Sequence, residues 1–249
     1  MKSLVLLAFI LLMTGFIQAQ EKIDRKNGDP KLSEYWEPIP PVVTPGKTPM
    51  DAPGDAVILF NGKDFNSWKS DSGRIQWTLE EGAMTVKPKS GGISTRQVFG
   101  DCQLHIEWRT PAVISGEGQG RGNSGIFLMG KYEVQVLDNY NNRTYVNGQA
   151  GSIYKQTPPL VNACRPPGEW QTYDIIFTAP RFYEDGRVQS PARITVLQNG
   201  ILVQHNTTIW GSTEYRGTPE YKKLGLKEPL FLQEHGNLVS YRNIWIRNL

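Results

Sequence analysis

Four carboxylates, Glu107, Glu133, Asp138 and Glu234, fall in or beside short apolar segments of this 249-residue chain. A positioned carboxyl group can take or give a proton, and pairs of carboxyl groups cleave glycosidic bonds. A single carboxylate in such a place is more often a plain surface charge. The residues around each carboxylate therefore decide whether it predicts a reactive site.

Polar and apolar residues alternate in segments 104–109 and 132–136. The polar side chains are His105, Glu107 and Arg109 in the first segment, and Glu133 and Gln135 in the second. Because successive side chains of a strand point to opposite faces, we expect one sheet face to carry these groups. The alternative is that this face is only the solvent side of an antiparallel sheet.

Residues 120–125 match the G-x-G-x-x-G fingerprint of dinucleotide-binding proteins, but a strand-like run follows them where that fold needs a helix. A glycine-rich loop at the rim of a site is the better interpretation. The three histidines are far apart, and neither a cysteine cluster nor a nucleophile-elbow pattern occurs. The sequence thus predicts no structural zinc site and no serine triad, and it leaves open a metal held by oxygen ligands.

Short apolar or alternating runs, separated by Gly, Asn, Asp and Pro, predict the strands. They cover residues 57–60, 77–79, 83–86, 102–110, 124–129, 132–137, 171–178, 192–198, 201–207, 230–234 and 239–247. No window predicts an amphipathic helix of ordinary length, so a parallel sheet lacks its crossover helices. We expect an all-β sandwich or jelly roll of two antiparallel sheets, with Asn199 and Gly200 in a tight hairpin turn.

The N-terminus has the pattern of an export signal. Lys2 precedes an apolar run over residues 4–13, and Ala19 supplies a small residue for cleavage. The run is shorter than the ~20 residues that cross a bilayer, so we expect a signal peptide over 1–19 and no stable membrane insertion. The mature protein is then periplasmic or secreted, where Cys102 and Cys164 form a disulfide or remain two separate thiols.

Residues 20–56 are expected to form an extended arm, because seven of the 17 prolines fall in it without an apolar period. Tyr35, Trp36 and Ile39 predict that the arm lies against the body, which comprises residues 57–249. Lys+Arg (27) exceeds Asp+Glu (24) by only 3. This surplus is too small for unspecific nucleic-acid binding, so no nucleic-acid partner is expected.

Eight short segments form a joint signature in chain order. They are residues 59–64 with Trp68, 122–126, 132–138 (Tyr-Glu-Val-Gln-Val-Leu-Asp), 150–154, 168–170, 198–200, 232–236 (Leu-Gln-Glu-His-Gly) and 241–244. Together they resemble the 3-keto-disaccharide hydrolase family, also described as 3-keto-glucoside 1,2-lyase/3-keto-2-hydroxyglucal hydratase. The resemblance implies a concanavalin A-like jelly roll over 57–249. It also implies a carbohydrate substrate whose C3 hydroxyl a separate sugar 3-dehydrogenase has oxidised to a ketone.

The implied chemistry needs a base and a partner for an oxyanion. A C3 ketone acidifies the C2 proton, so a base can remove it, the group at C1 can leave, and water can add to the resulting glucal. Within the resemblance, Glu133 is the leading base candidate, Glu107 is the second carboxylate, and Arg109 and His235 stabilise the enolate or leaving-group oxygen. The candidates for binding substrate hydroxyls are Asn123, Gln135, Asp138, Tyr154 and Gln233.

Alternatives to this assignment stay open. A divalent metal held by some of these oxygens would stabilise the enolate equally well, and Asp138 could instead cap the turn that follows it. The protein could also be a lectin or carbohydrate-binding module without catalysis, because fold does not decide function. A conventional glycoside hydrolase is the third possibility, and it would cleave the unoxidised sugar.

Overall fold

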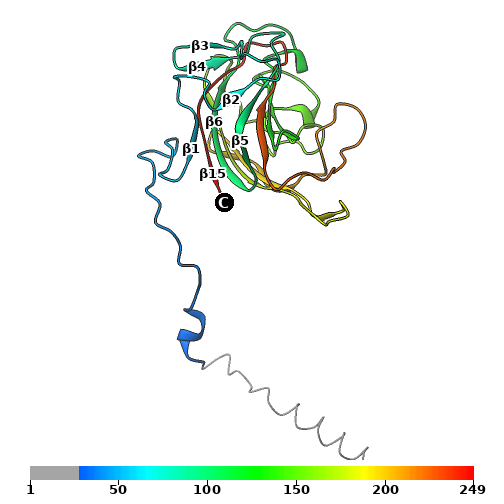
Figure 1. Cartoon of the computed structure of the whole chain (residues 1–249). Coiled ribbons are helices and arrows are strands. Elements are labelled where there is room, and N and C mark those ends of the chain that lie inside the picture. Colours follow the sequence, from blue (N-terminus) through cyan, green and yellow to red (C-terminus); the bar gives the residue numbers. More distant parts are fainter. Residues whose placement is uncertain (1–27) are drawn as a thin grey trace, which may run out of the picture. The chain divides into compact units, whose positions relative to one another are not determined.

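The computed structural model describes residues 28–249, and the chain divides into two compact units, Met1–Val42 and Val43–Leu249. In the first unit, the described residues form a short 3-10 helix, η1 (Pro30–Ser33), and extended chain (Figure 1). The predicted signal peptide, 1–19, lies outside the described residues. The packing predicted for Tyr35, Trp36 and Ile39 stays a prediction. Among residues 28–249, no helix is long and apolar enough to cross a bilayer.

The second half of the predicted arm belongs to the larger unit, which begins at Val43 and not at Val57. The carbonyl oxygen of Met50 accepts hydrogen bonds from Trp245 Nε1 and Asn243 Nδ2, both at 3.0 Å. Asp55 pairs with Arg247 at 2.7 Å. These contacts attach the segment to the last strand of the sandwich.

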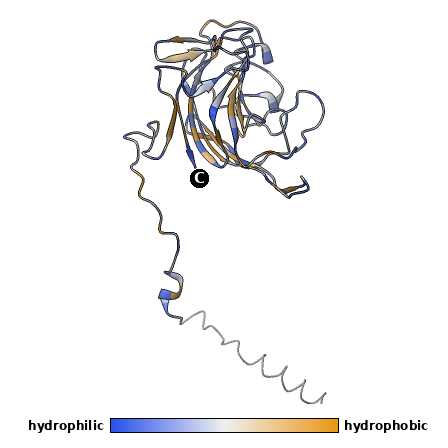
Figure 2. Cartoon of the chain, in the orientation of Figure 1, coloured by the Kyte–Doolittle hydropathy of each residue, from blue (hydrophilic) through white to orange (hydrophobic). Residues whose placement is uncertain are grey.

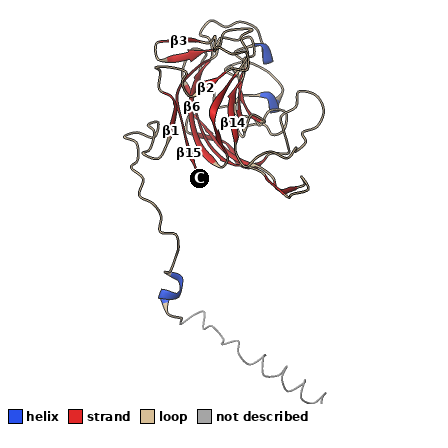
Figure 3. Ribbon diagram, in the orientation of Figure 1, coloured by secondary structure: helices blue, strands red, loops and turns tan. Residues whose placement is uncertain are grey.

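The larger unit is an all-β sandwich of antiparallel sheets, as predicted, and Figure 3 shows only short 3-10 turns besides strands in the part of the chain described. The 3-10 turns of this unit are η2 (Gly118–Gly120) and η3 (Val146–Gly148). The eight-stranded sheet has the order β13 (Ile201–Thr208), β12 (Arg193–Gln198), β9 (Gln171–Thr178), β6 (Cys102–Arg109), β15 (Ser240–Asn248), β4 (Ala83–Thr85), β3 (Thr78–Glu80), and β1 (Val57–Phe60) also pairs with β15. The five-stranded sheet has the order β2 (Trp68–Lys69), β5 (Ile93–Phe99), β14 (Glu228–Leu232), β7 (Ser124–Leu128), β8 (Tyr132–Val136). A separate ribbon pairs β10 (Arg181–Phe182) with β11 (Val188–Ser190).

The core lies between the two sheets and follows the alternation of the sequence. Ile106 and Trp108 on β6, and Val134 and Val136 on β8, are almost completely buried. The Trp108 ring packs against Tyr173 of β9, with 5.2 Å between ring centroids. Figure 2 shows hydrophobic residues concentrated on the strands. Each such side chain stabilises the fold by about 1.5–3 kcal/mol, and the alternating polar residues are directed away from the core.

Two local predictions have different outcomes. Asn199 and Gly200 have φ angles of 53° and 79° and join β12 to β13 with Gln198 opposite Ile201, which confirms the hairpin. Strand β5 was not predicted, because three exposed residues follow one another in it and its pairing with β14 is irregular. A bulge of this kind disrupts the period of two that identifies a strand.

Candidate functional site

A cavity of 220 Å³ opens on the outer face of the five-stranded sheet. Glu133 and Gln135 of β8 enter it because their neighbours Val134 and Val136 are turned into the core. The lining residues are Asn123, Phe127, Glu133, Gln135, Tyr154, Thr213, Tyr215, Gln233 and His235. The structure therefore brings together six residues that the sequence predicted: Asn123, Glu133, Gln135, Tyr154, Gln233 and His235.

Glu133 is buried at the floor of this pocket, with 4% of its surface exposed. Its backbone is fixed on two sides, since its N–H donates to Thr213 Oγ1 at 3.0 Å and its carbonyl accepts from the N–H of Tyr154 at 3.2 Å. Burial raises the pKa of the Glu133 carboxyl to about 8. A carboxyl group with this pKa exchanges protons near neutral pH, as general acid–base catalysis requires.

Gly125 provides the space that the Glu133 carboxylate occupies. The two residues lie on the paired strands β7 and β8, and a Cβ atom at Gly125 would collide with Glu133 Oε1 and approach Phe127 Cε2 to 2.7 Å. Gly122 adopts a positive φ of 58°, which favours glycine. Gly125, in strand β7, thus makes room for the carboxyl group, and Gly122 lies in the loop directly before Asn123, which lines the pocket.

Gln135 is a neutral neighbour of the carboxyl group. With its amide nitrogen turned toward Glu133, it donates to Oε1 at 2.9 Å and to the carbonyl of Ser124 at 3.3 Å. In the opposite orientation the nitrogen donates to Gln119 Oε1 at 3.1 Å. The amide can therefore hold either the carboxyl group or the loop that carries Gln119.

Tyr154 forms another part of the wall and is paired with Tyr145 beside the pocket. The hydroxyl groups of Tyr145 and Tyr154 share a hydrogen bond of 2.6 Å, and burial raises the pKa of both phenols. Lys155 Nζ donates to the carbonyl of Tyr215 at 2.9 Å and lies 4.4 Å from the Tyr215 ring centroid. The phenols remain protonated at neutral pH, so they are hydrogen-bond donors beside a fixed positive charge.

Gln233 and His235 follow β14 on a loop at the pocket's edge. The backbone N–H of Gln233 donates to the carbonyl of Gly125 at 2.9 Å, while the Gln233 Oε1 atom is buried without a hydrogen-bond partner among the described residues. His235 is exposed at the opening. A buried acceptor without a partner, directed into a polar pocket, is a position where a ligand hydroxyl would bind.

Strand order fixes how these groups lie relative to one another. β14, β7 and β8 are consecutive, and the segment that carries Tyr154 bridges the outer edge of β8. The loop with His235 is joined to β7, whereas Tyr154 is bonded to the backbone of Glu133. Because neighbouring strands are about 4.8 Å apart, Glu133 lies between His235 on one side and Tyr154 on the other.

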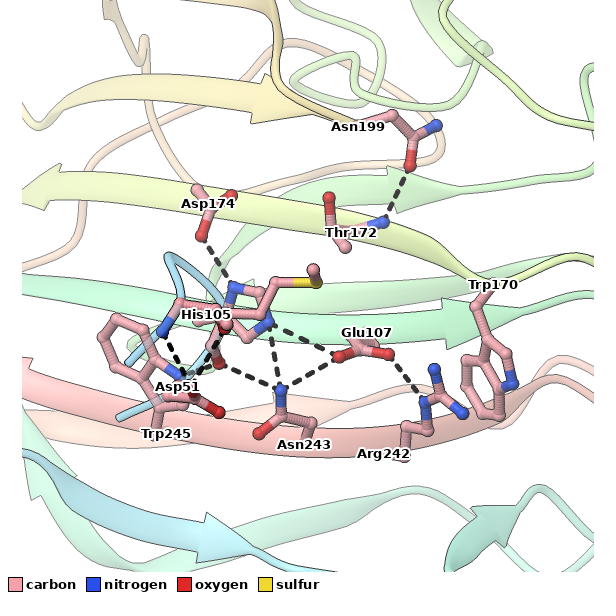
Figure 4. Close-up of polar contacts among 12 residues, drawn as sticks. Asp51, His105, Glu107, Trp170, Thr172, Asp174, Asn199, Arg242, Asn243 and Trp245 are labelled. Carbon is pink, nitrogen blue, oxygen red and sulfur yellow. Dashed lines mark hydrogen bonds and ion pairs between the residues drawn. The ribbon is translucent and has the colours of Figure 1, made fainter. Parts of the chain in front are cut away.

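Glu107 lies in a different part of the molecule, so the predicted pairing of two carboxylates in one site is contradicted. It faces outward from the eight-stranded sheet, where Arg242 and Asn243 donate to it at 2.6 Å and 2.9 Å (Figure 4). Burial would raise the pKa of Glu107, but hydrogen bonds from His105, Asn243 and Arg242 lower it to about 2. Glu107 is a permanent anion in an ionic cluster on the far sheet.

His105 is the cation of the same cluster. Its Nδ1 atom lies 2.7 Å from Asp174 Oδ1, and its ring stacks on Trp245 with 5.3 Å between centroids (Figure 4). Burial opposes its charge, but the hydrogen bonds to Asp174 and Glu107 prevail and raise the pKa of His105 to about 9. The polar face of β6 is therefore a paired, mostly buried network and not the exposed solvent side that the alternative reading expected.

Arg109 and Asp138 also lie outside the pocket. The guanidinium of Arg109 stacks on Trp170 at 4.6 Å from the ring centroid, on the same face as Glu107. Asp138 pairs with Arg121 at 2.7 Å and accepts from the backbone N–H of Tyr140 at 3.1 Å, as in the alternative turn role. Neither residue joins the cavity that contains Glu133.

Comparison with known proteins identifies the family. The model of the 3-keto-alpha-glucoside-1,2-lyase-like domain matches residues 55–247. The chain belongs to this family. The recognition drawn from the eight motifs is thereby confirmed, and the matched range contains every residue of the pocket.

Relatives of this family have been named and solved. The chain is 28% identical to a 3-keto-disaccharide hydrolase of Bacteroides thetaiotaomicron over 165 residues, which are 51% of this chain and 54% of that protein. It therefore spans about half the length of that curated relative. A crystal structure of a candidate glycosyl hydrolase from Parabacteroides distasonis is 54% identical, with a TM-score of 0.85 over 89% of this chain and 97% of that one. A second structure from the same organism, 23% identical with a TM-score of 0.56 over 78% and 94% of the two chains, shares the fold.

Three residues that line the pocket were not predicted: Phe127, Thr213 and Tyr215. Tyr145 and Lys155, which contact the lining residues Tyr154 and Tyr215, were not predicted either. Tyr145 and Lys155 flank the 150–154 motif, so the motif was a signal for them. Thr213 and Tyr215 lie in a loop without periodicity, so no sequence signal pointed to them.

Among residues 28–249, no three His, Cys, Asp or Glu side chains converge to hold a metal ion, and Cys102 and Cys164 are separate thiols.

Proposed function

We propose that this protein cleaves the glycosidic bond of a sugar with a ketone at C3, by removing the C2 proton and expelling the group at C1. The observation that carries the proposal is Glu133, a buried carboxyl group whose pKa is raised to about 8 inside the pocket. Such a group is a stronger base toward a carbon acid than an ordinary carboxylate. The family and its relatives supply the substrate class.

The number of carboxylates favours elimination over conventional glycoside hydrolysis. Conventional retaining and inverting enzymes place two carboxyl groups roughly 5–10 Å apart across the bond. Among the described residues that line this cavity, Glu133 is the one carboxylate, and Glu107 lies on the other sheet. Elimination beside a ketone needs one base together with donors for the oxygen, and the pocket contains both kinds of group.

In the proposed reaction, the carboxylate of Glu133 takes the proton from C2. The C–H electron pair becomes the double bond of an enolate, and the negative charge goes to the C3 oxygen. Collapse of the enolate forms the C1–C2 double bond and breaks the bond from C1 to the leaving oxygen. Addition of water to this glucal would complete a net hydrolysis.

The donors on the two sides of Glu133 fit the two oxygens of this reaction. The hydroxyl of Tyr154, supported by Tyr145 at 2.6 Å and by the charge of Lys155, would donate to the C3 oxygen. His235, on the other side, would protonate the leaving oxygen at C1. Preorganised donors at a developing oxyanion commonly contribute 10²–10³ in rate. Gln233 Oε1, Gln135 and Asn123 would bind the remaining hydroxyls.

The decisive experiment incubates the purified protein with phenyl 3-keto-glucoside and with its unoxidised parent, and measures phenol release. We expect release from the keto sugar alone. Glu133→Gln should lower kcat at least 10³-fold while the KM or the binding constant changes little, and Glu80→Gln, at an exposed position, is the matched control. Equal cleavage of the unoxidised parent would favour a conventional glycosidase, and binding without turnover in the wild type would favour a lectin.

Three further parts of the proposal rest on the sequence and the family. The ketone would be supplied by a separate sugar 3-dehydrogenase, and residues 1–19 would direct export to the periplasm or medium. A divalent metal is the alternative partner for the enolate oxygen. Loss of turnover in a chelator, restored by a divalent ion, would assign that role to a metal in place of Tyr154.

A further inference from the structure

A second hollow, of 410 Å³, lies beside the pocket and is walled mainly by apolar side chains. Its apolar members are Pro88, Pro111, Val113, Ile114 and Leu238. Val113, Ile114 and Leu238 have 82%, 55% and 53% of their surfaces exposed. A cluster of exposed apolar side chains around a concave surface is typical of a binding site for an apolar group.

The hollow adjoins the pocket along two chain segments. Asn123 and His235 line the pocket. Gly122, which precedes Asn123, and Gly236, which follows His235, line the hollow. The two segments are joined where they meet, since the backbone N–H of Asn123 donates to Asn237 Oδ1 at 2.6 Å. A molecule bound at Glu133 would therefore reach the hollow by extending past His235.

The charges near the hollow are already paired. Arg121 Nε lies 2.7 Å from Asp138 Oδ2, and Arg121 also donates to the carbonyl of Tyr140 at 2.8 Å. Both side chains are almost completely buried. The ion pair therefore does not require a charged ligand for neutralisation, and the apolar rim favours binding of an apolar group.

At the other end of the pocket lies a hollow of different character. It has 310 Å³, shares Phe127 and Thr213 with the pocket, and is lined by charged side chains that include Lys131, Glu214 and Arg216. It lies at the turn between β7 and β8, away from His235. The leaving group must be next to the acid that protonates it, so the apolar hollow beyond His235 is the better position for it.

We propose that the apolar hollow around Val113 and Leu238 binds the leaving group of the substrate and selects an apolar, aromatic aglycone. This inference rests on the proposed function, because it takes the sugar to be held at Glu133. An aromatic ring would cover the exposed surfaces of Val113, Ile114 and Leu238 while its oxygen remains beside His235. The charged hollow then lies on the side of the sugar away from the scissile bond.

The test compares kcat/KM for phenyl 3-keto-glucoside and methyl 3-keto-glucoside in the wild type, Val113→Ser and Leu238→Ser. The ratio of phenyl to methyl, taken relative to the wild-type ratio, cancels the difference in leaving-group chemistry. We expect each substitution to lower this relative ratio about tenfold, since one lost apolar contact has roughly that effect on discrimination. Leu226→Ser, at a position 72% exposed and away from both hollows, is the matched control and should leave the ratio unchanged.

The outcomes separate this inference from the proposed function. If the wild type cleaves both sugars and neither substitution changes the ratio, the apolar hollow is not the leaving-group site and the proposed function stands. If Arg216→Ala changes the ratio and the two serine variants do not, the leaving group lies in the charged hollow and this inference is wrong. If the wild type cleaves neither 3-keto sugar, both proposals fail.

Discussion

Gly125 lies directly against the carboxyl group of Glu133, and the missing side chain of the first residue is what allows the second to be buried. A Cβ atom at Gly125 would approach Glu133 Cδ to 3.0 Å and collide with Oε1. Neighbouring residues on β7 and β8 have little freedom to move, because their backbones are paired. The pKa of Glu133 therefore depends on a glycine on the adjacent strand.

Gly125→Ala should displace the Glu133 carboxyl group without unfolding the sandwich. Overpacking of this kind costs typically 1–3 kcal/mol, and we expect kcat to fall at least tenfold because the base is misplaced. Thermal unfolding and kcat measured on the same preparation check both parts. Gly120→Ala, where an added Cβ meets nothing within 4 Å, is the control; equal activity of the two variants would contradict the role given to Gly125.

The pH dependence of turnover should report the raised pKa of Glu133. Only the ionised carboxyl group accepts the C2 proton, so kcat/KM should rise with pH up to about 8. Phenol release measured across this range, at constant ionic strength, gives the profile. A rising limb centred near the ordinary value of 4.5 would show that the group is not desolvated in solution.

The same carboxyl group should make stability depend on pH. Its pKa is 4.5 in an ordinary environment and about 8 when folded, so the folded form retains a proton that the unfolded chain loses. Stability from this source is present below about 4.5 and is lost as the pH rises toward 8. The difference in unfolding free energy between Glu133→Gln and the wild type should therefore grow over this range in denaturant titrations. A constant difference would contradict the assignment.

Glu107→Gln should separate stability from catalysis. The substitution removes the anion that Arg242 and His105 face. Because the Arg242 side chain is 41% exposed, solvent screens this pair, and we expect the cost to be below the roughly 3–5 kcal/mol of breaking a fully buried ion pair. Because Glu107 is on the sheet that does not form the pocket, kcat/KM should stay within about threefold of the wild type at a temperature where both are folded. A loss of turnover as large as that of Glu133→Gln would restore Glu107 as a catalytic candidate.

The stability that His105 adds in the same cluster has the opposite pH dependence to that of Glu107. Its pKa is raised from 6.5 to about 9, so the stability it adds is present below about 6.5 and is lost as pH rises through 9. The pKa of Glu107 is lowered from 4.5 to about 2, so its contribution is present above 4.5 and is lost as pH falls toward 2. Asp174→Asn removes a partner that raises the pKa of His105, so the loss of stability on the alkaline side should begin at lower pH. Unfolding titrations at several pH values would show this.

Tyr154→Phe should lower kcat more than it raises KM, if its hydroxyl meets the enolate oxygen. Removal of one oxyanion donor typically costs 10²–10³ in rate. Tyr145→Phe keeps the donor and removes only its partner at 2.6 Å, so a smaller loss is expected. Equal increases in KM for both variants, with kcat unchanged, would indicate that the pair binds substrate without taking part in the chemical step.

The alternation of polar and apolar residues predicted the fold and the shared face of Glu133 and Gln135, whereas the other members of the site came from the family resemblance. The period of two in segments 132–136 and 104–109 correctly separates core from outer face on each strand, so Glu133 and Gln135 were placed together. The alternation of polar and apolar residues does not determine which sheet a strand joins. Glu107 and Glu133 have the same local pattern, yet strand pairing puts them on different sheets.

The remaining residues of the site depend on long-range contacts that no local pattern encodes. Thr213 reaches the pocket because its hydroxyl accepts from the backbone of Glu133, 80 positions away in sequence. The burial of His105 depends on neighbours on β9 and β15, and so does its charge. Such contacts are products of strand order, which the sequence pattern leaves undetermined.

The carbonyl group of Met50 accepts two hydrogen bonds from β15, and this has a practical result for anyone who shortens the protein. A fragment that starts at residue 55, where the family match begins, would leave the indole N–H of Trp245 and the amide of Asn243 without their acceptor. Asn243 also holds Glu107, so the loss would extend into the charged cluster beneath. Recombinant versions of this enzyme family member should therefore retain the chain from Val43 onward to preserve the back of the sandwich.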